Sequence, residues 1–77
     1  MIAVQSRMAR AALGWGVRDL AQAARVSPDT IARLERGETL YARTIEAIRA
    51  AIEAAGVEFI EENGAGPGVR LRKSETP

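Results

Sequence analysis

Hydrophobic side chains recur at helical spacing through most of the first 56 residues of this 77-residue chain. In residues 17–24 four of them stand at i, i+3, i+4 and i+7: Val17, Leu20, Ala21 and Ala24. In residues 28–36 the apolar positions are Ile31 and Leu34. Apolar residues spaced in this way line one face of an α-helix and pack it against a core. The pattern therefore predicts two short amphipathic helices in succession.

The break between these two helices is marked by residues that start and stop helices. Ser27 offers an N-cap oxygen, and Pro28 occupies the first helical position, where a missing N–H costs nothing. Gly37 can take the left-handed conformation that ends the second helix. Arg25 stands in the turn, where a left-handed residue other than glycine costs on the order of 1 kcal/mol. Two such helices, with a small Ala21 where they cross, have the sequence form of a helix-turn-helix.

Further helices are predicted on both sides of this motif. Residues 4–13 are expected to bury Met8, Ala12 and Leu13. A later helix has Thr44 as its cap and Gly56 after its end. Its apolar stripe consists of Ile45, Ile48, Ala51, Ile52 and Ala55. Trp15 precedes the second helix, where an apolar residue can staple the entering chain, and Leu40 is expected to turn inward.

After Gly56 the pattern changes to the alternation typical of β-strands. Residues 57–61 and 69–72 are rich in strand formers, and the Gly-rich segment between them predicts a hairpin. Its apolar face is formed by Val57, Phe59, Val69 and Leu71. On the other face Glu58 can oppose Arg70 or Arg72, and Ile60 is left there among charges.

A two-stranded sheet with exposed edges is rarely stable by itself. We therefore expect the hairpin to form a dimer interface, whose residues would be Phe59, Ile60, Val69 and Leu71. A hairpin that only caps the helices is the alternative.

The central motif resembles a known family. The positions that carry the resemblance are Leu20-Ala21, Ala24, Val26-Ser27, Ile31 and Glu35-Arg36-Gly37. Over about residues 4 to 56 the chain resembles the lambda-repressor-like, Cro/C1-type (XRE) family of DNA-binding domains. The expected fold is mostly α: a four-helix lambda-repressor-like helix-turn-helix domain (1–56), a C-terminal β-hairpin (57–72) and a disordered tail (73–77).

The exposed face of the second helix of the motif carries the candidate DNA-reading residues. Arg33 alone has the fork that matches guanine O6 and N7. Ser27 and Thr30 suit a base edge or a phosphate, and Asp29 either stabilises its own helix start or accepts from a cytosine amino group. The resemblance adds Pro28, whose ring could contact a thymine methyl. The candidate contacts to the DNA backbone are Arg10, Arg18, Arg36, Tyr41 and Arg43.

Charge is unevenly distributed along the chain. Residues 1–43 hold seven Arg against four acids, whereas residues 44–77 hold three Arg and one Lys against six acids. The first part is therefore +3 and the second −2, which places the DNA face in the N-terminal part. Arg outnumbers Lys ten to one, as suits phosphate and guanine contacts, although a GC-rich genome would produce the same ratio.

Several classes of function are disfavoured by composition. The chain has no Cys and no His, so thiolate metal sites and the commonest general base are excluded. We expect no cofactor, no metal and no enzymatic activity. No apolar run approaches the ~20 residues of a membrane span, and no signal peptide is recognised, which favours a cytoplasmic, nucleoid-associated protein.

The expected function is that of a sequence-specific DNA-binding transcription regulator. In this interpretation a homodimeric repressor inserts helix 28–36 into the major groove of double-stranded DNA at a palindromic operator. The alternative is an antitoxin or adaptor module that binds a protein partner, with DNA binding secondary. Exposed Ile60 and the acidic strand residues Glu58, Glu61 and Glu62 favour that alternative.

Overall fold

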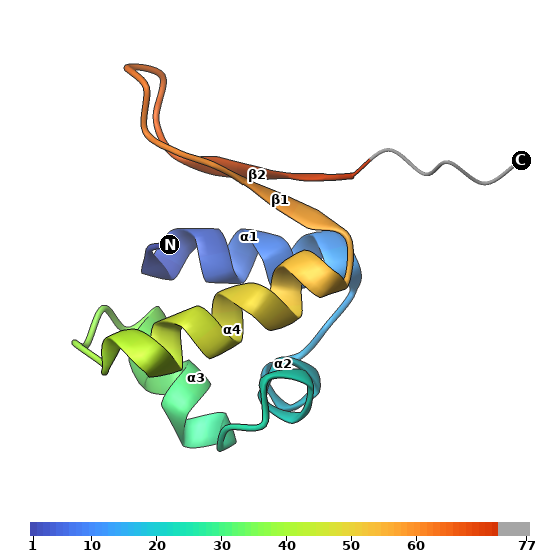
Figure 1. Ribbon diagram of the computed structural model, residues 1–77, viewed down its shortest axis with the longest axis vertical. Helices are drawn as coiled ribbons and strands as arrows, with labels where there is room; N and C mark the ends of the chain where they lie inside the picture. The colour runs from blue at the N-terminus through green and yellow to red at the C-terminus, as the bar shows by residue number, and fades with distance from the viewer. Residues whose placement is uncertain (73–77) are drawn as a thin grey trace, which may run out of the picture.

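The fold was examined in a computed structural model, which describes residues 1–72. The predicted disordered tail, 73–77, lies outside the described residues. The elements in chain order are α1 (Ala3–Leu13), α2 (Val17–Ala24), α3 (Pro28–Glu35), α4 (Ala42–Ala54), β1 (Val57–Ile60) and β2 (Gly68–Leu71). The prediction of a mostly α fold with four helices and a C-terminal hairpin is confirmed. In Figure 1, α1 and α4 lie between the hairpin on one side and α3 on the other.

The turn between α2 and α3 has the predicted chemistry. Ser27 is the N-cap of α3, and its Oγ accepts a hydrogen bond from the Thr30 amide at 3.1 Å. Pro28 is the first helical residue. Arg25 is left-handed, with φ 59°, as its place in the turn predicted, and Gly37 follows α3 with φ 87°. Local sequence therefore determines where α3 begins and ends.

Two predictions about α4 are wrong. Its N-cap is Tyr41 rather than Thr44, because the Tyr41 carbonyl accepts from the amides of Thr44 and Ile45 at 3.0 and 3.1 Å. Thr44 therefore lies inside the first turn. At the other end α4 finishes at Ala54, so Ala55 is its C-cap and is exposed instead of belonging to the apolar stripe.

The buried face of α1 also differs from the prediction. Ala12 is exposed, and Met8 and Leu13 are only half-buried. The buried residues are instead Gln5, Ser6 and Ala9. The apolar pattern pointed to the wrong face because it counts polar residues as exposed, whereas Gln5 and Ser6 are buried with hydrogen-bond partners of their own.

The core lies where all four helices and β1 meet. Its fully buried large apolar side chains are Leu20, Ile31, Ile48, Ile52 and Val57. Smaller or less enclosed members are Ala9, Ala21, Ala24 and Leu34. Trp15, Val26 and Leu40 pack against this core while half-buried, as expected. Because Val57 is completely buried, the hairpin shares one core with the helices.

The strands pair antiparallel with Val57 opposite Leu71, Glu58 opposite Arg70, Phe59 opposite Val69 and Ile60 opposite Gly68. The predicted pairing of Glu58 with Arg70 is confirmed by an ion pair of 3.0 Å. Ile60 is half-buried rather than left in solvent, and its Cδ1 lies across Gly68, which has no side chain to occupy that space.

Leu71 does not join the face that covers the helices. Its exposed fraction is 56%. Burial decreases along β2, from half-buried Val69 to the exposed residues at the open end of the hairpin.

Within residues 1–72 no helix is long and apolar enough to cross a bilayer.

Candidate nucleic-acid interface

The predicted base-reading residues are all accessible at the start of α3 or along it, and none is buried in the core. Ile31, Leu34 and Glu35 form the buried side of the helix. At the start of the helix Ser27, Pro28 and Asp29 are exposed, while Thr30 and Arg33 are half-buried. The N-terminal half of α3 is therefore free to enter a groove of DNA, as helix-turn-helix docking requires.

Three of these residues line one hollow of about 570 Å³ between α3 and the start of α4. Ser27, Thr30 and Arg33 contribute from the α3 side, and Tyr41 and Thr44 from the α4 side. Pro28 and Asp29 do not line it. The hollow is rich in hydroxyl groups, with the Arg33 guanidinium at its edge, so it presents hydrogen-bonding groups in a concave surface.

Local hydrogen bonds decide which polar atoms on α3 are free. The hydroxyl oxygens of Ser27 and Thr30 are 2.9 Å apart, so these two side chains are linked to each other. Arg33 donates through Nε to Glu38 Oε1 at 3.0 Å. Its two Nη groups have no partner among residues 1–72. Asp29 lies in the first turn of α3, and its side chain makes no hydrogen bond within residues 1–72.

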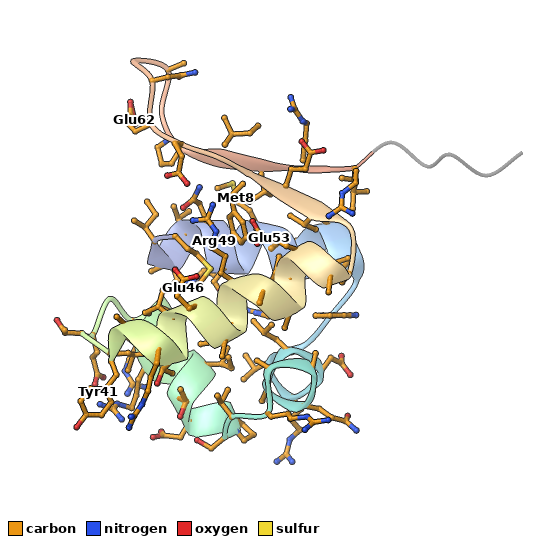
Figure 2. The ribbon with its side chains drawn as sticks, in the orientation of Figure 1. Met8, Tyr41, Glu46, Arg49, Glu53 and Glu62 are labelled. Atoms are coloured by element: carbon orange, nitrogen blue, oxygen red, sulfur yellow. The ribbon has the colours of Figure 1, made fainter. Side chains whose placement is uncertain are left out.

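The predicted backbone contacts form two groups beside α3. Arg18 is exposed in the first turn of α2. Tyr41 has an exposed fraction of 74%, and the Arg43 guanidinium lies 5.2 Å from its ring centre. Arg36 is exposed just after α3 and is bound to Glu38. Tyr41 lies at the lower left of Figure 2, beside side chains that end in nitrogen.

Arg10 has a different environment from the one expected. The sequence suggested a surface residue that contacts phosphate, but only 21% of its side chain is exposed. Its Nη2 and Nε donate to the two carboxylate oxygens of Glu35, at 2.7 and 2.9 Å, and its Nη1 donates to the Trp15 carbonyl at 3.3 Å. The surface position is therefore a wrong prediction, because a bidentate ion pair draws Arg10 inward.

Glu35 is the centre of this network and was not singled out as a functional residue from the sequence. Ser6 Oγ donates to its carboxylate at 2.7 Å, and Arg7 donates to its backbone carbonyl. Burial raises the pKa of Glu35, but the hydrogen bonds from Arg10 and Ser6 and the charges of Arg10 and Arg7 outweigh burial, so its pKa is lowered. The hydrogen bond to Glu35 raises the pKa of Arg10. The ionised pair ties the end of α3 to α1 and fixes the orientation of the recognition helix.

A signal for Glu35 was present in the sequence. It follows Leu34 and stands four residues after Ile31, so it lies at the margin of the buried stripe of α3. A charged residue in that position calls for an opposite charge inside the fold. Which arginine supplies it depends on how α1 packs, and the spacing along the chain does not contain that information.

Acidic side chains gather on the other side of the molecule. Figure 2 shows Glu62 on the hairpin and Glu53 and Glu46 along α4, with Tyr41 at the start of that helix. Glu53 and Glu61 both bind Arg49, at 3.3 Å each. Arg49 therefore offsets part of the acidic charge on this side of the molecule.

Comparison with known proteins identifies the family to which this fold belongs. No curated protein sequence matches the chain significantly. Residues 3–61 match the helix-turn-helix domain family, a match that extends from the start of α1 to the end of β1 and covers most of the chain. The pair α2–α3 supplies the motif for which the family is named, and the chain belongs to the DNA-binding helix-turn-helix domain family.

Proposed function

We propose that the protein is a sequence-specific transcription regulator of the Cro/C1 type, which inserts α3 into the major groove of duplex DNA. The observation that carries this proposal is Arg33, which lies on the exposed side of α3 with both Nη groups unpaired within residues 1–72. Two N–H donors in a fixed fork match guanine O6 and N7, and such a pair discriminates by about 1–3 kcal/mol against a wrong base.

The other residues of the α3 surface would extend the reading of bases. The linked hydroxyls of Ser27 and Thr30 can donate to a base edge or a phosphate next to the guanine. The exposed Pro28 ring offers an apolar contact to a thymine methyl. Within residues 1–72 the Asp29 side chain makes no hydrogen bond that would hold it to the helix start, which supports acceptance from a cytosine amino group.

The backbone of the DNA would be held on both sides of α3. Arg18 approaches from the start of α2, and Arg36, Tyr41 and Arg43 approach from the segment after α3. Contacts of this kind fix register and carry no sequence information. Arg10 takes no part in this proposal, because its guanidinium is bound to Glu35.

We further propose a homodimeric repressor that binds a palindromic operator in the nucleoid, where it blocks access to a promoter. Half-sites of a palindrome lie about 34 Å apart on one side of the duplex, so both α3 helices must face the same way. Copies joined through the broad face of the hairpin would turn their α3 helices apart, because α1 and α4 lie between the hairpin and α3 (Figure 1). Contact at the Leu71 end of the hairpin would keep the two α3 helices on the same side of the dimer. The exposure of Leu71 supports this contact.

The protein-interaction alternative has less support than DNA binding, although Glu61 and Glu62 remain exposed. Ile60 is half-buried, Glu58 is bound to Arg70, and Glu61 is bound to Arg49. The acidic strand therefore has partners within the chain, and no second function is proposed.

The test replaces Arg33 and compares two duplexes, one selected from genomic fragments by the wild-type protein and one of random sequence. For Arg33→Ala we expect a loss of about 1–3 kcal/mol on the selected duplex and a much smaller loss on the random one. Fluorescence anisotropy at several salt concentrations measures both affinities.

Arg70→Ala is the matched control. It removes the same charge and also frees one carboxylate, but on the hairpin, away from α3. We expect it to leave the ratio of the two affinities unchanged. An equal loss on both duplexes from Arg33→Ala would contradict base reading, and absence of binding to any duplex at low salt would contradict the proposed function as a whole.

A further inference from the structure

Glu38 lies three residues after the end of α3 and binds two arginines, Arg33 of that helix and its C-cap Arg36. We propose that Glu38 is a specificity-determining residue: it positions the guanidinium of Arg33 for the base edge and weakens attraction of the same surface to backbone phosphates. This inference rests on the proposed DNA-binding function. Glu38 is not among the DNA-contacting residues that were expected from the sequence.

The backbone fixes where Glu38 stands. Gly37 is left-handed, its amide donates to the Leu34 carbonyl at 2.9 Å, and the Glu38 amide donates to the Arg33 carbonyl at 3.0 Å. These two bonds are the pattern of a Schellman motif, which folds the chain back over the last turn of a helix. The Cα of Glu38 is thereby held next to Arg33 without any help from its side chain.

The carboxylate uses one oxygen for each arginine. Oε1 accepts from Arg33 Nε at 3.0 Å, while Oε2 accepts from Nε and Nη2 of Arg36 at 3.0 and 2.7 Å. Arg33 is thus held at the Nε edge, and the Nη pair stays free for a guanine. A long side chain that is already restrained loses less rotamer freedom when it binds, which favours the one geometry that a guanine accepts.

The same carboxylate reduces attraction to phosphate. The hydrogen bonds from Arg36 and Arg33 lower the pKa of Glu38, so it carries its charge at neutral pH. A phosphate that approaches Arg36 must compete with this carboxylate and is repelled by it. Affinity for DNA of any sequence comes mainly from phosphate contacts, so Glu38 lowers non-specific binding more than it lowers binding to the correct site.

Two substitutions separate the two effects. Glu38→Gln removes the charge and keeps an oxygen that can accept from Arg33 Nε, whereas Glu38→Ala removes both. We expect both variants to bind random duplex about two- to fivefold more tightly, a range set by the energies of exposed ion pairs. If Arg36 gains a phosphate contact, the dependence of log affinity on log salt steepens by about 0.9.

On the selected duplex the gain should be smaller, so the ratio of specific to random affinity falls by at least about twofold. Glu38→Ala should in addition accept bases other than guanine at the position that Arg33 reads, as single-base variants of the selected duplex would show. Both variants should keep the wild-type melting temperature within error, because the turn is made by backbone bonds.

Glu46→Gln is the control, since Glu46 is an exposed acid on α4 (Figure 2), and Arg33 and Arg36 pair with Glu38 instead. It changes net charge equally and should leave the affinity ratio unchanged. An unchanged ratio in both Glu38 variants, or an equal change in Glu46→Gln, would overturn this inference and leave the proposed function intact. A wild-type protein that binds neither duplex would remove the proposed function and this inference with it.

Discussion

At the scale of single residues, the position of the recognition helix depends on a buried carboxylate. Glu35 is almost completely buried, and every side chain that binds its carboxylate comes from α1. Removal of one partner from a buried ion pair leaves the other charge uncompensated, which costs far more than the pair contributes. Glu35 therefore links stability to the orientation of α3.

Glu35→Gln should lower the free energy of unfolding by about 3 kcal/mol at pH 7, because Arg10 is left without its counter-charge. Urea unfolding followed by circular dichroism measures the change. Glu46→Gln, which changes an exposed acid, should lie within about 0.5 kcal/mol of wild type. A loss of less than 1 kcal/mol in Glu35→Gln would show that the pair is not needed.

The pH dependence of the same unfolding curves provides a second measurement. The folded pKa of Glu35 is below its ordinary value of 4.5, so its contribution is fully present above pH 4.5 and is lost as pH falls through the folded pKa. Wild-type stability should therefore drop below pH 4.5, and Glu35→Gln should lose less over the same interval. Parallel curves for the two proteins would contradict this assignment.

At the scale of elements, the hairpin is held to the helices by polar contacts as well as by its apolar face. Gln5 on α1 donates through Nε2 to the carbonyls of Ile60 and Gly68, at 3.1 and 3.0 Å. On the α4 side the Arg49 guanidinium lies 4.9 Å from the Phe59 ring centre. The two contacts hold the closed end and the middle of the hairpin on separate helices, which orients the sheet on the core.

Gln5→Leu should lower stability by about 1–3 kcal/mol, since two buried carbonyls lose a donor. We expect the loss to be concentrated in the hairpin, whose amides should exchange with solvent faster while those of α3 remain protected. Hydrogen exchange followed by NMR measures both. Gln22→Leu, at an exposed position of α2, is the control. An equal increase in the exchange rate of all amides would show that the hairpin does not open separately from the helices.

At the scale of the whole molecule, the hairpin and the recognition helix occupy opposite sides of a body measuring 37 × 31 × 20 Å. Dimer geometry is therefore constrained more tightly than the sequence suggested. Of the four residues expected at an interface, Phe59, Ile60 and Val69 are half-buried within the chain, and Leu71 alone is mainly exposed. The proposed contact consequently centres on the open end of the hairpin.

Leu71→Glu should convert a dimer to a monomer without loss of fold, because Leu71 contributes little to the core. Sedimentation velocity at micromolar concentration measures the state, and affinity for a palindromic duplex should fall to that for a single half-site. Ala65→Glu adds the same charge in the exposed hairpin loop and should leave the dimer intact. A wild-type protein that sediments as a monomer would contradict the dimer proposal.

Features that depend on neighbours along the chain could be predicted from the amino-acid sequence. Ser27 and Gly37 delimit α3 through hydrogen bonds to residues three positions away, and Pro28 is its first residue. The alternation after Gly56 predicted which strand residues face each other. Caps, turns and strand alternation are local physics, so the helix-turn-helix and the exposed side of α3 could be read without a structure.

Side-chain partners that come from distant parts of the chain depend on how the helices and the hairpin pack together. Arg10 is drawn to Glu35, 25 positions away, and Gln5 holds carbonyls more than 50 positions away. The spacing of apolar residues cannot reveal such contacts, because a polar residue is buried only when packing of distant elements supplies its partner. The same reason explains why α1 presents Gln5 and Ser6 to the interior, and why Leu71 remains exposed at the end of an apolar strand face.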